Sequence, residues 1–134
     1  MTANENKVIV RRIWEEVLNN RDLAAADEIF NREYAEHEKS WLLEWCSSFP
    51  DTHLTVEDMI AEEDKVVTRF TVRATHRGPF MGIEGSGNTI TIMGIWIHRL
   101  EDGRIVEGQN WGAGDWLGLL QQMGAQIVPP QTKE

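Results

Sequence analysis

The sequence predicts an α+β fold in which N-terminal helices pack on one face of a curved antiparallel sheet. Apolar residues recur at helical spacing through the first fifty residues, and from His53 onward the spacing changes to that of strands. Helices followed by strands that are joined through short turns are typical of α+β domains. The chain has 134 residues and no internal repeat, so we expect a single domain, 1–134, with a core over about 7–124 and a flexible tail at 125–134.

The first half of the chain predicts three helices. Glu5–Asn19 carries one apolar stripe at i, i+3, i+4, i+7 and i+8, formed by Val10, Ile13, Trp14, Val17 and Leu18. Asp22 is expected to cap a short helix over 23–30, and Ser40 to cap a third helix over 41–49 that ends before Pro50. The apolar residues of these helices are expected to pack in the hydrophobic core. In a cone-shaped fold the first helix would also wall the cavity, where Trp14 or Val17 would touch a ligand.

His53–Glu62 and Lys65–Thr75 predict a hairpin that turns through Glu63-Asp64. Arg69 and Arg73 share one side of its second strand. Two arginines on a strand usually mark a solvated face, but on a concave face either would bind an anionic or carbonyl group. The loop that follows, 76–88, holds the apolar residues Phe80 and Met81, as expected of a lid over a pocket.

The stretch from Thr89 to Gly124 predicts a long strand, a tight turn, a second strand and a closing helix that begins at Asp115. The first strand is apolar on both faces, so helices should cover one face and a cavity or partner subunit the other. A two-residue loop at Asp102-Gly103 would pair Asn110 with Ile95. A three-residue loop that includes Glu101, with a bulge, would pair Asn110 with Gly94. The sequence permits both registers.

The composition excludes several classes of protein. A formal net charge of −9 argues against a nucleic-acid partner, and no apolar run is long enough to span a membrane. The polar start, MTANENK, predicts no secretory signal. Cys46, the single cysteine, rules out an internal disulfide and fits a reducing compartment, so we expect a cytoplasmic protein. Six tryptophans indicate an aromatic-lined interior or interface.

Four segments resemble the SnoaL-like polyketide cyclase family, also called the ester cyclase-like group of the nuclear transport factor 2-like superfamily. They are VRRIWEEVLNNRDLAAADEIF, DKVVTRFTVRATHRGPFMGI, IHRLEDGRIVEGQNW and DWLGLLQQMG, and together they span about Lys7 to Gly124. The resemblance implies a cone-like α+β barrel with a deep pocket, commonly a homodimer packed through the sheet. It also implies a small hydrophobic ligand, and no metal or organic cofactor.

In the characterised cyclases of the family, an aspartate before a tryptophan on the last strand is the general acid/base of an intramolecular aldol closure. The matching residue here is Asn110, before Trp111, and a pocket histidine of those cyclases falls at Trp96. Both positions lie in the pocket there, so the resemblance favours the bulged register. An amide cannot exchange a proton near neutral pH and only donates or accepts hydrogen bonds. The catalytic aspartate of the family is therefore replaced here by Asn110, which cannot act as an acid or a base.

The remaining acid/base candidates are His98, two residues from Trp96 on the same face, and His37, where family members often carry a histidine. Asp115 is expected to act as a helix cap, and Asn110 as a hydrogen-bond donor to a carbonyl. The sequence leaves three functions open: a cofactor-independent cyclase, isomerase or lyase; a non-catalytic binder; and an epoxide hydrolase. The expected ligand contacts are Trp14, Val17, Trp41, Phe80, Met81, Trp96, Trp111 and Arg69.

Overall fold

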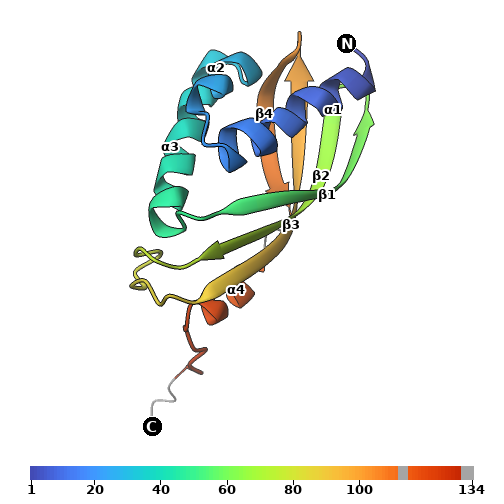
Figure 1. Ribbon diagram of the computed structural model, residues 1–134. Helices are drawn as coiled ribbons and strands as arrows, with labels where there is room; N and C mark the ends of the chain where they lie inside the picture. The colour runs from blue at the N-terminus through green and yellow to red at the C-terminus, as the bar shows by residue number, and fades with distance from the viewer. Residues whose placement is uncertain (112–114, 131–134) are drawn as a thin grey trace.

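The computed structural model describes residues 1–111 and 115–130, without the side chains of 109–111. Its helices are α1 (Ala3–Arg12), the π-helix η1 (Ile13–Asn19), the 3-10 helix η2 (Leu23–Ala25), α2 (Ala26–Ile29), α3 (Arg32–Ser48) and α4 (Trp116–Gln122). Its strands are β1 (His53–Glu62), β2 (Lys65–Thr75), β3 (Thr89–Glu101) and β4 (Arg104–Trp111) (Figure 1).

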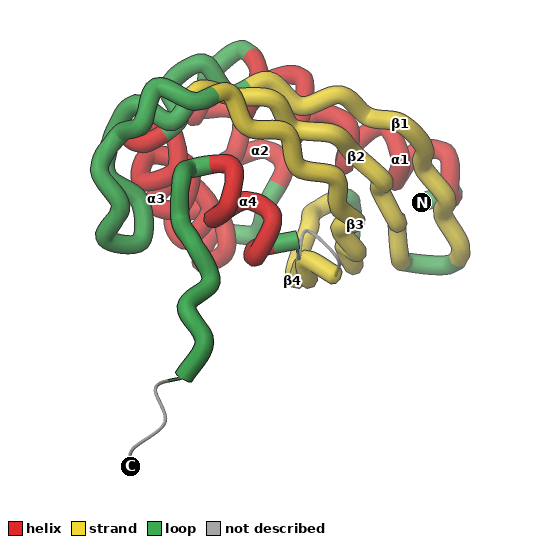
Figure 2. The backbone as a smooth tube through the Cα atoms, turned by 90° about the horizontal axis from the view of Figure 1, so that it is seen from below, coloured by secondary structure: helices red, strands yellow, loops and turns green. Residues whose placement is uncertain are grey.

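The four strands form one antiparallel sheet in the order β1-β2-β3-β4. Figure 2 shows the sheet bending, with the N-terminal helices on its concave side. The α+β architecture expected from the sequence is confirmed. None of the helices in the described ranges combines the length and apolar character that a membrane-spanning segment needs.

The first predicted helix is present, but its second half is a π-helix. Thr2 caps α1 by accepting a hydrogen bond from the Glu5 amide at 3.1 Å. The wider π turn places Ile13, Trp14, Val17 and Leu18 together in the core. The apolar spacing therefore gave the buried face correctly and carried no signal for the change in helix type.

A single helix, α3, replaces the separate segment and helix that the sequence predicted over 31–49. Its cap is Asn31, whose side chain accepts from the Tyr34 amide at 2.9 Å, and Ser40 lies exposed within the helix. The prediction of a cap at Ser40 was wrong because the residues between 32 and 40 contain no helix breaker. The longer helix carries Glu38 on its buried side.

The turn between β3 and β4 has two residues, Asp102 and Gly103, both in the left-handed region with φ of 50° and 77°. The predicted three-residue loop was therefore wrong. A bulge lies farther along, between the Arg99–Glu107 and Leu100–Ile105 pairs. The bulge pairs Asn110 with Trp96, a register that matches neither predicted alternative. The backbone register still places position 110 on the face of the sheet that carries Trp96.

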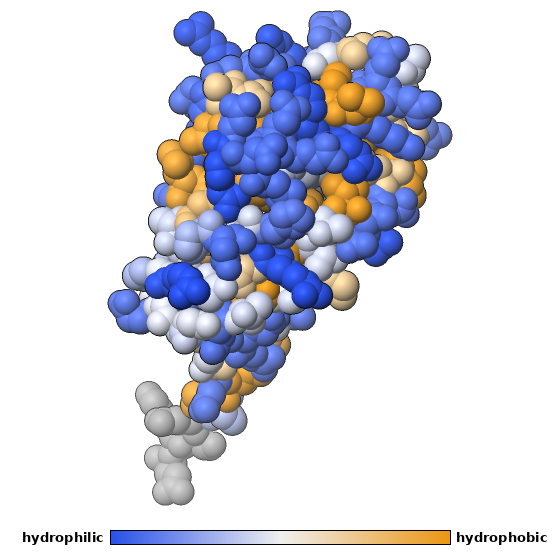
Figure 3. All heavy atoms as spheres, viewed as in Figure 1, coloured by the Kyte–Doolittle hydropathy of each residue, from blue (hydrophilic) through white to orange (hydrophobic). Residues whose placement is uncertain are grey.

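The two faces of the sheet differ in burial, whereas the sequence predicted a cover on each face. Ile90, Ile92 and His98 are buried on the concave face, whereas Met93 and Ile95 are exposed on the convex face. The concave face and the helices enclose the hydrophobic core. On the side of the molecule where α1 lies in front of the sheet, the surface is mainly hydrophilic, with separate apolar areas (Figure 3).

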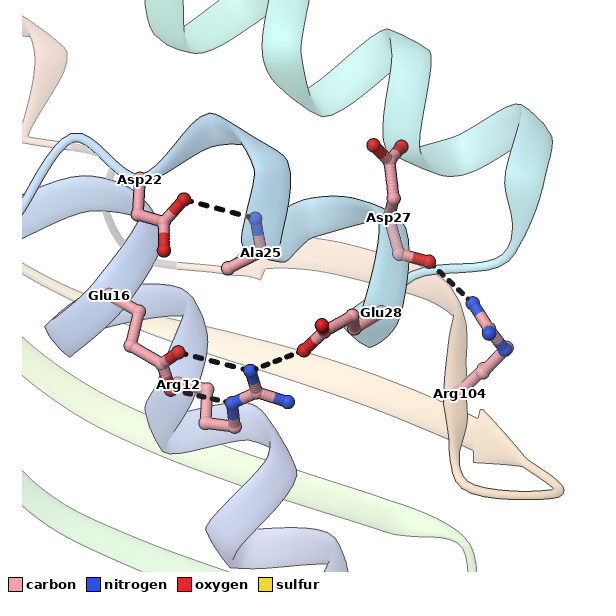
Figure 4. A network of polar contacts seen from close by, with 7 residues as sticks. All are labelled: Arg12, Glu16, Asp22, Ala25, Asp27, Glu28 and Arg104. Atoms are coloured by element: carbon pink, nitrogen blue, oxygen red, sulfur yellow. Dashed lines mark hydrogen bonds and ion pairs between the residues drawn. The ribbon is translucent and has the colours of Figure 1, made fainter.

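Polar contacts fasten the short helices to the sheet. The Arg12 guanidinium donates to Glu16 at 2.5 Å and to Glu28 of α2 at 2.7 Å (Figure 4). Asp22 caps η2 as expected, and Arg104 at the start of β4 donates to the Asp27 carbonyl at 2.6 Å. These contacts hold α2, and through it the start of α3, beside the β3–β4 turn.

Candidate functional site

A largely apolar cavity of about 60 Å³ lies between the N-terminal helix, α3 and the concave face of the sheet. Its walls are Ile13, Trp14, Leu18, Glu38, Trp41, Leu42, Trp45, Thr52, Leu54, Phe70, Val72, Ile92, Trp96, His98 and Trp116. Of these described residues, Glu38 and His98 are the two that titrate. Pockets for drug-sized ligands measure roughly 300–1,000 Å³, so this cavity holds only the small end of a larger molecule.

A wider outer groove of about 360 Å³ borders the cavity and shares three tryptophans with it: Trp41, Trp45 and Trp116. Trp41 stacks on Trp45 with ring centroids 5.8 Å apart, and Phe80 stacks on Trp116 at 6.3 Å. Trp41 and Trp116 are 39% and 42% exposed, so their rings form a wall between the cavity and the groove that also faces solvent.

His98 is buried in the wall of the cavity, with 2% of its surface exposed. Its ring stacks on Trp96 at 5.4 Å and meets Trp14 at 5.7 Å. Its Nδ1 atom has no hydrogen-bond partner within the described ranges. Burial lowers the pKa of His98 to about 3, so the imidazole is neutral at physiological pH.

Glu38, on α3, is the carboxyl group of the cavity wall, and the sequence did not single it out. It is 9% exposed, and burial raises its pKa. The neighbouring Tyr34 hydroxyl and the nearby His37 oppose that rise. The available signal was its position: Glu38, Leu42 and Trp45 share the buried side of α3, so the carboxylate interrupts an apolar stripe.

Gly108 of β4 brings this side of α3 close to His98. A Cβ atom at Gly108 would lie 2.7 Å from the Tyr34 hydroxyl oxygen and 2.9 Å from His98 Nε2. Only glycine allows the backbone of β4 to approach both side chains, because any Cβ would overlap them. The strand that carries position 110 therefore passes directly beside Tyr34 and His98.

Several residues predicted to contact a ligand do line these two spaces. Trp14, Trp41, Trp96 and His98 lie in the wall of the cavity, and Phe80 and Met81 line the outer groove. Val17 is buried in the core and is not among the residues that line either space. The side chains of Asn110 and Trp111 lie outside the described part of the structure.

Two predicted site residues lie elsewhere. His37 is exposed on α3, because the continuous helix turns Glu38, and not its neighbour, toward the cavity. Arg69 is exposed on the convex face, where it pairs with Ile95, and Arg73 is exposed on the same face four residues later. The strand alternation that buries Phe70 and Val72 turns both arginines away from the cavity, which corrects the placement of Arg69 in the ligand site.

Asp115 is a helix cap, as expected: its carboxylate accepts a hydrogen bond from the Gly118 amide at 2.8 Å. Across the described ranges, no three His, Cys, Asp or Glu side chains gather closely enough to hold a metal ion.

The fold recurs in solved structures of other proteins. TsrD from Streptomyces laurentii is 26% identical, with a TM-score of 0.82 over 94% of this chain and 99% of that one. AclR from Streptomyces galilaeus, a proposed hydroxylase, is 26% identical with a TM-score of 0.79, covering 96% and 87% of the two chains. IdmH from Streptomyces antibioticus, a proposed polyketide cyclase, is 25% identical with a TM-score of 0.75, covering 90% and 99%.

No curated protein matches the chain. The family model described as SnoaL-like polyketide cyclase matches residues 8–123, which include every helix and strand of the cavity wall. The chain belongs to the SnoaL-like polyketide cyclase family.

Proposed function

We propose that this protein binds a small hydrophobic carbonyl compound and catalyses cofactor-free proton transfer at the carbon next to its carbonyl, as cyclisation or isomerisation requires. The observation that carries the proposal is the burial of His98, neutral and with Nδ1 unpartnered in the described structure, in an apolar cavity walled by tryptophans. An apolar cavity with few polar groups is typical of small-molecule sites. Membership of the family supports the same chemistry.

The pKa of His98 defines its role in this reaction. The sequence favoured His98 as the base, but an imidazole whose pKa is lowered to about 3 accepts a proton weakly near pH 7. A neutral imidazole is instead a suitable N–H donor to the carbonyl oxygen on which charge develops. We assign His98 as this donor.

Position 110 contributes a second donor in this proposal. Its backbone pairs with that of Trp96, whose side chain lines the cavity. Cross-strand partners share a face of the sheet, which supports a place for Asn110 near the ligand. An amide there would donate a hydrogen bond to the carbonyl oxygen without exchanging a proton.

A non-catalytic binding protein is the alternative function. The tryptophan lining and the amide at position 110 favour it, because both bind a ligand without chemistry. The epoxide hydrolase alternative loses its support. That reaction requires two carboxylates and an arginine that converge on one water, and both Arg69 and Arg73 lie exposed on the convex face.

Methyl acetoacetate is a suitable probe because it is a small β-keto ester with acidic C2 protons, and the same solution without protein gives the background rate of exchange. Binding is measured from the quenching of tryptophan fluorescence, and proton transfer from the loss of the C2 proton signal in D₂O by NMR. We expect saturable quenching and an exchange rate that rises in proportion to protein concentration. Quenching without faster exchange would favour the binding protein, and the absence of both would reject the site.

Replacing Asn110 with Asp tests whether the site has kept the family's geometry. We expect the carboxylate to raise the C2 exchange rate by about tenfold or more, because it adds a base where the family places one. Asn4→Asp, at an exposed position on α1, is the matched control and should leave the rate unchanged. Equal rates for Asn110→Asp and the original protein would count against inherited geometry at position 110.

A further inference from the structure

We propose that Glu38 is the catalytic base of this site and takes over the task that the family gives to the aspartate at position 110. This inference rests on the proposed function and names the group that removes the proton. It has three supports: the place of Glu38 in the cavity, the contact that orients its carboxyl group, and the complementary character of His98.

Glu38 reaches the cavity because α3 runs unbroken from its cap at Asn31. Among the described residues of the wall, it is the one carboxyl group, and every other member except His98 is apolar, aromatic or a threonine. Burial of a carboxyl group in such a wall is unfavourable, since leaving water destabilises its charged form. Its burial beside a hydrogen-bond donor therefore indicates a functional role.

Tyr34 orients the Glu38 carboxyl group from one turn earlier on the same helix. Its hydroxyl lies close enough to the Glu38 carboxyl group to lower the pKa of that group, and its ring packs on Phe30 with centroids 5.1 Å apart. Burial and the charge of Glu38 raise the pKa of Tyr34, so the phenol keeps its proton. Tyr34 is thus a positioning residue, and its contact leaves Glu38 with capacity to accept a substrate proton.

The pKa values of the two titratable groups in the cavity wall are shifted in opposite directions. Burial raises the pKa of Glu38, which makes its carboxylate a stronger base than an exposed glutamate, and lowers that of His98, which keeps the imidazole neutral. Opposite pKa shifts of this kind allow one group of a site to act as the base and the other as a neutral hydrogen-bond donor.

The step balances without a cofactor. A Glu38 oxygen takes the proton from the carbon next to the carbonyl, so the C–H bond breaks and an O–H bond forms. The electron pair moves to the carbonyl oxygen, which accepts a hydrogen bond from the N–H of His98. The Glu38 carboxyl group exchanges its proton for a deuteron from the solvent, and the enolate then takes that deuteron, which gives exchange in D₂O. Alternatively it attacks a second carbonyl carbon of the same molecule, and the new alkoxide takes the proton.

Glu38→Gln tests the base directly, because the amide keeps the shape of the side chain and an oxygen for the Tyr34 hydroxyl. We expect the C2 exchange rate of methyl acetoacetate to fall by about 100-fold or more, with its Kd changed less than about threefold. Glu36→Gln, at an exposed position on the same helix, is the matched control and should leave the rate unchanged. Thermal denaturation of both variants shows that they are folded.

Tyr34→Phe supplies a readout that a structural role would not move. The Tyr34 hydroxyl lowers the pKa of Glu38, so its removal should shift the rise of exchange rate with pH to higher pH. Glu38→Asp should keep measurable exchange, because it retains a carboxylate.

Each result bears on one proposal or both. Exchange that persists in Glu38→Gln overturns the assignment of Glu38 and leaves the proposed function standing. Loss of binding together with exchange makes Glu38 a ligand-positioning group and also overturns it. Absence of exchange in the original protein overturns both proposals, and the fluorescence measurement then shows whether the protein still binds.

Discussion

His98 ties the stability of the protein to pH. Its pKa in the folded protein is about 3, below the value near 6.5 that it has in an unfolded chain. Below pH 6.5 the unfolded chain therefore binds a proton that the folded protein does not. Acidification therefore lowers the free energy of unfolding, and the decrease continues until the pH reaches the pKa of His98 in the folded protein.

We expect the free energy of unfolding to fall by about 1.4 kcal/mol per pH unit below pH 6.5 through His98 alone. Urea unfolding of the original protein and of His98→Gln, at several values between pH 7 and pH 4, measures this contribution as the difference between their slopes. His53→Gln, at an exposed histidine, should keep the original slope. Parallel slopes for the original protein and His98→Gln would show that His98 titrates normally when folded.

At the scale of elements, α4 completes the wall that separates the cavity from the outer groove, through Trp116. The helix has seven residues, too few to be stable on its own, so its cap matters. Asp115 provides that cap through the Gly118 amide.

Asp115→Ala should destabilise the protein by about 1 kcal/mol, since it removes the acceptor for one exposed helical amide. Differential scanning calorimetry measures the change as a lower Tm. Asp115→Asn keeps an acceptor and should stay close to the original Tm. If both variants lost the same stability, the charge of Asp115, and not its cap, would be responsible.

The convex face of the sheet is the surface through which we expect two copies of the whole molecule to pair. Ile60 on β1 and Met93 and Ile95 on β3 are exposed there. Val67, which pairs with both Ile60 and Ile97, is half-buried, as is Ile97. Exposed apolar side chains gathered on one face are typical of an interface. The opposite side, around α1, is mainly hydrophilic (Figure 3).

We expect Met93→Glu combined with Ile95→Lys to convert a dimer into a monomer, because charges would enter an apolar interface. Sedimentation velocity at micromolar protein measures the change. Val8→Glu, at an exposed apolar residue of α1, is the control and should remain dimeric. A monomeric original protein at these concentrations would reject the interface.

The elements and their buried faces were predictable because they depend on local spacing. The stripe through Val10, Trp14 and Val17 and the alternation along β3 each bury one side whatever the element packs against. Hairpin strands 53–62 and 65–75 have the predicted bounds for the same reason. Cap chemistry at Asp22 and Asp115 was equally local.

The candidate site was predictable only in part, because it is made where distant elements meet. The sequence indicated Trp14, Trp96 and His98, which lie on regular apolar faces. It missed Glu38, whose place in the cavity depends on α3 continuing past Ser40, and it placed His37 and Arg69 in the site although both are exposed.

The sequence by itself determined most of the helices and strands and their apolar sides, though not the first half of α3, since these features follow from residue spacing along one element. Tertiary structure decided the register of β4, the approach of Gly108 to Tyr34 and His98, and the cavity between them. Those features depend on a one-residue bulge and on contacts between residues far apart in the sequence, which form only when the chain is folded.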